Sequence, residues 1–188
     1  MKMIKTADEI NTLARSVTSA SGTYFVTAFS GLLAPYWDPG ATGLLVGLTS
    51  YTTPPHVARA TLEANAFQTH AVIKIMKLDS KSELAHLKVD GGMTAGDLVM
   101  EVLADVGGFE VVRPEMRESI ALGSALLAAS AVGLFGWDIT RPEAFGDVNT
   151  TLSTVFAPRM TAEERGRAWR GWQRAVERSR VWIETTEE

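Results

Sequence analysis

Cysteine is absent from the 188-residue sequence, which excludes disulfide bonds, thiolate metal sites and a cysteine nucleophile. The three histidines, His56, His70 and His86, lack a metal-ligand spacing, so we expect no metal site. No apolar run reaches the roughly 18 residues of a membrane span, and no apolar signal core follows the basic N-terminus. We therefore expect a cytoplasmic protein. The net charge of -4 gives no sign of a basic surface, so we do not expect nucleic acid as a partner.

The apolar content of 46% suffices for a core, and the length fits one domain. Hydrophobic periodicity and turn residues predict an α/β arrangement without internal repeats. We expect helices at 1–17, 55–78, 94–106, 119–133 and 161–183, strands at 24–29, 43–48, 87–90 and 110–114, and irregular structure at 137–157.

Several segments carry more specific expectations. The small residues of 119–133 favour a helix lying close against the sheet or a neighbouring helix. The loop Tyr36–Asp38 is expected to cover the core rather than to bind a ligand, because tryptophan is usually buried. Asn65 and Gln68 are expected to bridge backbone groups. The arginines of 161–183 alternate with glutamates, which favours a solvated, ion-paired face over a nucleic-acid stripe.

The most informative stretch runs from Leu87 to Met100 and reads as strand, glycine turn and helix. With the strand at 110–114 it forms a βαβ unit, whose strands should be parallel. Ligands of such sheets bind at the carboxyl ends of strands, which is where Asp90, Gly91 and Gly92 are expected. A glycine turn at a helix N-terminus favours an anion and lets a ligand approach the backbone. A plain turn without a ligand remains an equal alternative.

Candidate general bases are few. The sequence offers Asp90, Asp38 and Asp97, and it contains neither a P-loop pattern nor a Ser/His/Asp arrangement implied by position. From the residues alone, the prediction stops at an α/β domain with a glycine turn suited to a nucleotide.

Several runs of residues extend this prediction, because they resemble signatures of the FGGY carbohydrate kinases and, within that family, of the glycerol kinases. The resemblance covers nearly the whole chain, and residues 41–145 have a eukaryotic, fungal-like look. The matching runs are Gly43–Leu48, His56–Glu63, Tyr24–Pro39, Ala60–Thr69, Val89–Thr94 and Val112–Ala125.

The resemblance implies a partial RNase H-like lobe of the actin and hexokinase superfamily. Residues 1–188 would be the C-terminal lobe, truncated at its N-terminus and lacking its opening strands, with 161–183 as its C-terminal helix. The family's catalytic aspartate would lie in the missing N-terminal part, so no catalytic residue is expected in this chain. This makes Asp38 and Asp97 much weaker candidates for a catalytic base.

The resemblance also implies a nucleotide site at Asp90, Gly91 and Gly92, where the second glycine contacts ATP. The family's asparagine four residues later is replaced by Gly96, so Thr94 or Asp97 would have to substitute for it. The expected ligands are ATP or ADP with Mg²⁺, and glycerol only together with the missing lobe. A homodimer is left open.

Three functions follow as hypotheses. The first is the nucleotide side of a glycerol kinase, inactive as an isolated chain. The second is part of another FGGY sugar kinase, such as a xylulokinase or gluconokinase. The third is a non-catalytic module that binds nucleotide weakly or associates with a partner, because a sheet that lacks its neighbours exposes an edge and an apolar face.

Overall fold

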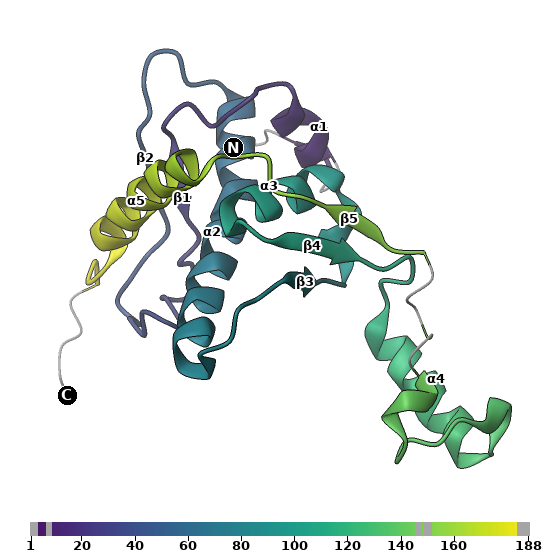
Figure 1. The fold of residues 1–188 in the computed structure, drawn as a ribbon. Coiled ribbons are helices and arrows are strands. Elements are labelled where there is room, and N and C mark those ends of the chain that lie inside the picture. The colour runs from purple at the N-terminus through teal and green to yellow at the C-terminus, as the bar shows by residue number, and fades with distance from the viewer. Residues whose placement is uncertain (1–3, 7–8, 146–147, 149–151, 184–188) are drawn as a thin grey trace.

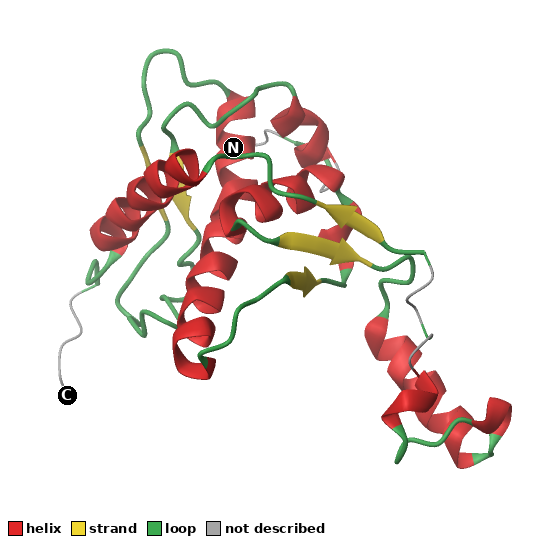
Figure 2. Ribbon diagram, viewed as in Figure 1, coloured by secondary structure: helices red, strands yellow, loops and turns green. Residues whose placement is uncertain are grey.

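The computed structural model describes residues 4–6, 9–145, 148 and 152–183 (Figure 1). Figure 2 shows two small sheets set among the helices. None of the described helices combines the length and apolarity needed to cross a membrane. The helices and strands, with three short 3₁₀ turns, are α1 (Glu9–Arg15), β1 (Tyr24–Val26), β2 (Leu44–Val46), α2 (Pro54–Ser80), β3 (His86–Lys88), η1 (Gly92–Ala95), α3 (Asp97–Gly107), β4 (Glu110–Arg113), α4 (Ser119–Ala131), η2 (Leu134–Gly136), η3 (Pro142–Phe145), β5 (Thr154–Phe156) and α5 (Ala162–Ser179).

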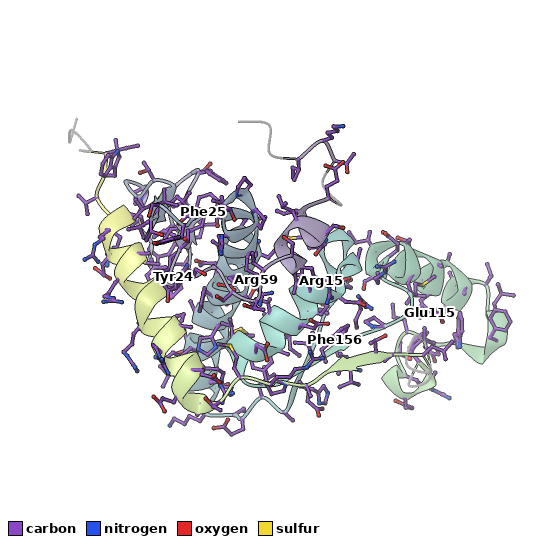
Figure 3. All side chains as sticks on the ribbon, turned by 90° about the horizontal axis from the view of Figure 1, so that it is seen from above. Arg15, Tyr24, Phe25, Arg59, Glu115 and Phe156 are labelled. Carbon is purple, nitrogen blue, oxygen red and sulfur yellow. The ribbon has the colours of Figure 1, made fainter. Side chains whose placement is uncertain are left out.

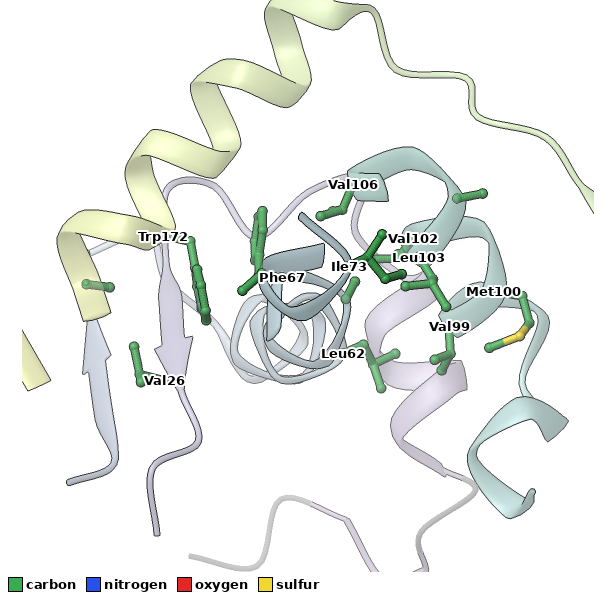
Figure 4. Close-up of a cluster of buried hydrophobic side chains, with 14 of the residues drawn as sticks. Val26, Leu62, Phe67, Ile73, Val99, Met100, Val102, Leu103, Val106 and Trp172 are labelled. Carbon is green, nitrogen blue, oxygen red and sulfur yellow. The ribbon is translucent and has the colours of Figure 1, made fainter. Parts of the chain in front are cut away.

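Helix α2 is the central element of the core. It begins after Thr53, whose backbone N–H donates to His56 Nδ1 at 3.2 Å, and it has prolines in its first turn, where no helical donor is lost. Figure 4 shows apolar side chains on both sides of α2. Phe67 faces Trp172 of α5, while Leu62 and Ile73 lie toward α3. Because α2 packs on both sides, it fixes α5 and α3 relative to each other.

The α5 side of the core is aromatic. The rings of Phe67 and Trp172 stack at 5.6 Å, and the Trp172 indole N–H donates to the Phe25 carbonyl at 3.3 Å. Viewed from above, Tyr24 and Phe25 lie beside α5 (Figure 3). Strand β1 pairs antiparallel with β2, with Phe25 opposite Leu45. The apolar face predicted for the last helix therefore anchors that helix on β1 and α2.

The predicted βαβ unit is confirmed. Strands β3 and β4 are parallel, with Leu87 opposite Val111, and α3 connects them. Helix α3 ends where expected, at a left-handed Gly108 whose N–H donates to the Ala104 carbonyl at 2.8 Å. The third strand, β5, pairs antiparallel with β4 inside the segment expected to be irregular. That expectation was wrong for Thr154–Phe156, which is too short to show an alternating pattern.

Two predictions about surfaces were wrong in part or in whole. The loop Tyr36–Asp38 covers the core through Tyr36, whose ring centre lies 6.1 Å from that of Trp172, but not through Trp37, which is 71% exposed. Helix α4 does not lie against the sheet, since Ala129 is its one buried residue in the described structure. Together with the segment that follows it, α4 extends away from the layers around α2, beyond the segment around Glu115 (Figures 1 and 3).

Several boundaries differ from the predicted ones. The described first helix is confined to Glu9–Arg15, and residues 1–3 and 7–8 lie outside the described residues. Strand β1 ends at Val26 and β2 at Val46. Helix α5 ends at Ser179, because Arg180 adopts an extended conformation, so Ile183 lies beyond it. The capping box predicted at Thr161 is confirmed, with Glu164 N–H donating to the threonine hydroxyl at 3.3 Å.

Asp38 is a structural residue of the loop after β1. Its carboxylate accepts hydrogen bonds from the backbone N–H groups of Gly40, at 2.9 Å, and Val181, at 3.1 Å, and from Arg180 Nε at 3.3 Å. Burial opposes ionisation, but these hydrogen bonds and the arginine outweigh it and hold the pKa of Asp38 below its ordinary value. The carboxylate therefore ties the end of α5 to this loop.

Candidate functional site

The glycine turn follows β3 at the carboxyl end of the parallel pair. Strand β3 ends at Lys88 rather than at Asp90, and α3 begins at Asp97 rather than at Thr94. Between them, Gly91 adopts a left-handed φ of 87°, which favours glycine, and η1 adds one 3₁₀ turn. The turn therefore does not open the α-helix directly, and the predicted start of that helix at Thr94 was wrong. Binding of an anion at the turn stays a prediction.

The turn is held by hydrogen bonds on both of its sides. Gly91 N–H donates to the Arg117 carbonyl at 3.0 Å. The Gly91 carbonyl accepts from the backbone N–H of Thr94 at 3.0 Å and from the Thr94 hydroxyl at 2.7 Å. The conformation of the turn is thus fixed without a ligand.

Arg113 joins the turn to the start of α3. Its Nη1 donates to the Thr94 carbonyl at 2.9 Å, and its Nη2 lies 2.8 Å from Asp97 Oδ1. Its guanidinium also lies 5.0 Å from the ring centre of Phe156 on β5. Arg113 comes from the end of β4, so the neighbouring strand positions the loop that follows β3.

The backbone at the two glycines is accessible. Apart from the adjoining residues of the chain, no heavy atom of the described residues lies within 4 Å of the position that a Cβ would take at Gly91 or at Gly92. The φ angle of Gly92 is not positive, so an alanine at this position would cause no backbone strain. A planar or anionic group can therefore come into direct contact with the backbone at Gly92.

Asp90 lies between two hollows. One, of about 540 Å³, is bordered by the ends of β3 and β4 and by Ser119 and Leu122 at the start of α4. The other, of about 390 Å³, lies between α2 and the turn, where Asn65 and Gln68 line it. The Asp90 side chain is exposed and forms no ion pair within the described part of the chain.

Gly96 is closely packed against α1. It is the N-cap residue of α3, and a Cβ there would collide with the side-chain amide of Asn11 on α1. Asn11 Oδ1 is buried and lacks a hydrogen-bond partner among the described residues. The amide of Asn11 therefore fills the space in which a side chain at position 96 would begin.

The predicted site residues are thus gathered in one loop, with different roles. Gly91 and Gly92 offer open backbone, and Asp90 offers a free carboxylate. Thr94 is buried with its hydroxyl proton used inside the turn, and Asp97 is engaged by Arg113. A nucleotide contact at any of these residues, Gly96 included, stays a prediction.

Some contributors were missed. Arg113 at the end of β4 and the Arg117 carbonyl in the segment after β4 hold the turn. Only the tertiary structure brings them there, although an arginine before a proline at a strand end is visible in the sequence. Asn65 and Gln68 do bridge backbone groups as predicted: their amides donate to the Thr61 and Ala34 carbonyls, at 3.2 and 3.0 Å.

The sequence of the chain is similar to a known protein family. Residues 2–132 match the model of the C-terminal domain of the FGGY family of carbohydrate kinases. Over 187 residues, the chain is 48% identical to glycerol kinase 1 of Streptomyces avermitilis and covers 36% of that protein. It is 42% identical to glycerol kinase 2 of Sulfolobus acidocaldarius, again covering 36%. The chain thus spans about a third of the length of these relatives. Because they are bacterial and archaeal, the expected fungal character is not supported.

The fold matches solved structures of the same kind. The crystal structure of Plasmodium falciparum glycerol kinase with ADP superposes with a TM-score of 0.83 at 30% identity, covering 95% of this chain and 35% of that one. A ligand-bound xylulose kinase from Lactobacillus acidophilus gives a TM-score of 0.73 at 21% identity, which shows the fold alone, over 94% of this chain and 35% of that one. The predicted α/β fold of the actin and hexokinase type is confirmed. The chain belongs to the FGGY family of carbohydrate kinases and carries the family's C-terminal domain.

Proposed function

We propose that the chain forms the nucleotide side of a glycerol kinase, which transfers the γ-phosphoryl group of ATP to a hydroxyl of glycerol in the cytoplasm, where ATP is available. The observation that carries this proposal is the 42–48% identity to proteins named glycerol kinase, sustained over nearly the whole chain. The likeness to a glycerol kinase structure with ADP supports the nucleotide part of the proposal.

The open glycine turn supplies the contact surface. ATP or ADP would lie against the backbone at Gly91 and Gly92, because neither position carries a side chain that would hold a ligand away. The turn is already held by Arg113 and by the Arg117 carbonyl, so binding does not have to order it.

Mg²⁺ would arrive bound to the phosphates. The described residues contain no cluster of three or more metal-ligating side chains, which fits an ion that takes most of its ligands from phosphate and water. Asp90 is the exposed carboxylate beside the turn that would complete such a shell, whereas Asp97 is paired with Arg113. The ion would neutralise phosphate charge during transfer.

Phosphoryl transfer depends on positioning both substrates in line. The family resemblance implies that the glycerol pocket and the catalytic base belong to a part of the kinase outside the region that this chain matches. We therefore expect the isolated 188-residue chain to show no turnover. Glycerol-dependent ADP formation by the purified chain would overturn this expectation.

Two other functions have weaker support. The structural likeness to gluconate and xylulose kinases, at 21% identity, supports the shared fold but not their substrates. A non-catalytic interaction module is favoured by one observation, the uncovered α4. Comparing glycerol with pentuloses as substrates of an enzyme that contains this chain would test the first alternative. Glycerol-dependent ADP formation by such an enzyme would exclude the second, whereas ADP binding alone is compatible with it.

Titration calorimetry with ADP tests the nucleotide site. Gly92→Ala places a methyl group in open space without backbone strain, so the fold is expected to persist while ADP affinity falls at least fivefold. Gly123→Ala is the matched control, because its added methyl group also meets open space but lies on α4. Equal ADP affinity in both variants would contradict contact at Gly92.

A further inference from the structure

Helix α5 carries three arginines in line on its exposed face. Arg170, Arg174 and Arg178 follow one another at intervals of four residues, so they extend along the helix over about 12 Å. The opposite face of α5 is buried through Trp172 and Val176, which fixes the orientation of the helix and keeps the arginines in solvent. Helix α5 lies at the outer edge of the molecule (Figure 3). We call these three arginines the arginine stripe.

Acidic side chains do not neutralise the arginine stripe. None of its three residues forms an ion pair in the described part of the chain. The glutamates of α5 are engaged elsewhere: Glu163 Oε1 lies 3.5 Å from Arg167 Nη2, and Glu177 Oε1 lies 3.6 Å from Arg180 Nη1. The ion-paired face predicted from the sequence is therefore confirmed at these two pairs and was wrong for the stripe.

The spacing of the stripe opposes the stability of the helix. Like charges four residues apart repel each other on a helix surface, and the stripe contains two such contacts in succession. The capping box at Thr161 and the buried face hold α5 in place despite this repulsion. Local arrangements that work against the fold without a compensating contact are typical of functional positions. A negatively charged ligand would convert the repulsion into attraction.

The stripe borders a shallow hollow of about 540 Å³ that only α5 lines. Arg167, Gln173 and Glu177 complete the lining. A guanidinium donates two parallel hydrogen bonds to a carboxylate or a phosphate, so each arginine can hold one such group. The arginines therefore offer an anion-binding position at every turn of the helix.

The size of the stripe indicates which anion fits. Nucleic acid or an anionic membrane extends far beyond 12 Å and would also be repelled by the rest of the chain, because the net charge of -4 already includes the stripe. A second helix laid along α5 presents its side chains with the same repeat of one turn. We propose that the arginine stripe docks an acidic helix of a partner protein, whose carboxylates lie one turn apart. This interaction goes beyond the kinase activity and does not involve the glycine turn.

Fluorescence anisotropy with two labelled peptides tests the spacing. The first peptide is an alanine-based helix of about 18 residues with glutamate at every fourth position. The second has the same composition, but its glutamates are contiguous. The complete 188-residue chain is expected to bind the first peptide saturably and the second at least threefold more weakly. Raising the salt concentration to about 150 mM should weaken both interactions, because the paired charges are exposed.

Two matched variants test the location. The first neutralises the stripe: Arg170→Gln, Arg174→Gln and Arg178→Gln. The control removes the same charge from exposed positions outside α5: Arg15→Gln, Lys81→Gln and Arg141→Gln. The stripe variant is expected to bind the first peptide about tenfold more weakly than the wild type, since each exposed pair contributes a small factor and three are lost. The control should bind it like the wild type.

Thermal unfolding separates docking from a structural role. The stripe variant should keep a Tm equal to or above that of the wild type, because the substitutions remove repulsion within α5. Its ADP affinity should be unchanged. The proposal would be overturned by a wild-type chain that does not bind the first peptide, by equal binding of the two peptides, by equal weakening in both variants or by a lower Tm of the stripe variant. Tighter binding of phosphatidylserine vesicles or of duplex DNA than of the first peptide would likewise overturn it.

Discussion

Arg113 holds the glycine turn, so its replacement is expected to loosen both the fold and the nucleotide site. Arg113→Met keeps an unbranched apolar stem but removes the guanidinium. The change breaks the hydrogen bond to the Thr94 carbonyl, the ion pair with Asp97 and the contact with the Phe156 ring. The turn then depends on the backbone hydrogen bonds at Gly91 and on the Thr94 hydroxyl.

The cost can be assembled from these contacts. A hydrogen bond from a charged donor to a carbonyl contributes roughly 1.5–3 kcal/mol. The ion pair adds less than about 1 kcal/mol, because the Asp97 side chain is 58% exposed and solvent screens it. The contact with Phe156 adds about 0.5–1 kcal/mol. We therefore expect a loss of about 2–5 kcal/mol, which lowers Tm by roughly 2–4 °C for each kcal/mol in a protein of this size.

Urea unfolding and ADP titration measure the two effects. The matched control is Arg141→Met. Arg141 Nε lies 3.5 Å from Asp138 Oδ2, and the Arg141 side chain is 72% exposed. Arg141→Met should therefore lower the free energy of unfolding by about 0.5 kcal/mol or less. ADP affinity should fall in Arg113→Met and stay constant in Arg141→Met. If Arg113→Met loses no more stability than the control, the role assigned to Arg113 is refuted.

Three further predictions concern packing and pH. Burial and neighbouring positive charges lower the pKa of His70 below its ordinary 6.5, so the folded state binds the proton less readily than the unfolded state. Stability should therefore fall as the pH drops below about 6.5, and His70→Phe should flatten this dependence in urea titrations at several pH values. Gly96→Asn should destabilise the chain through Asn11, and adding Asn11→Ala should restore part of the loss in a double-mutant cycle; strictly additive effects would exclude the contact. Trp172→Ala removes a buried ring and should cost about 3–5 kcal/mol, so a loss below 1 kcal/mol in thermal unfolding would contradict the central place given to the α2–α5 contact.

Local signals in the sequence predicted much of the fold. The glycines at the end of α3 and the capping box at Thr161 mark helix boundaries, because each satisfies backbone groups at a helix end. The strand, helix and strand around Gly91 imply a parallel pair on topological grounds, and the structure has it. These features depend on residues close together in the chain.

The predictions failed where contacts between residues distant in the sequence determine the local structure. Strand β5 is three residues long, and its pairing with β4 determines it more than its own composition does. The small residues of α4 predicted close packing against the sheet or a neighbouring helix, but Ala129 is its one buried residue in the described structure, and the segment that follows α4 supplies the hydrogen bond from Ile139 N–H to the Ser130 hydroxyl. Arg113 donates a hydrogen bond to the Thr94 carbonyl, nineteen positions earlier in the chain, and no local sequence pattern predicts this contact. The open backbone at Gly92 likewise follows from the tertiary arrangement and not from the glycine alone.

The central claim is that this domain binds the nucleotide at the glycine turn. An amide-resolved NMR titration of the ¹⁵N-labelled chain with ADP tests it most directly. The amides of Gly91 and Gly92 should shift in a saturable way, and Gly92→Ala should weaken the response at least fivefold. Saturable shifts confined to other parts of the chain, with the signals of 90–96 unmoved, would contradict the claim.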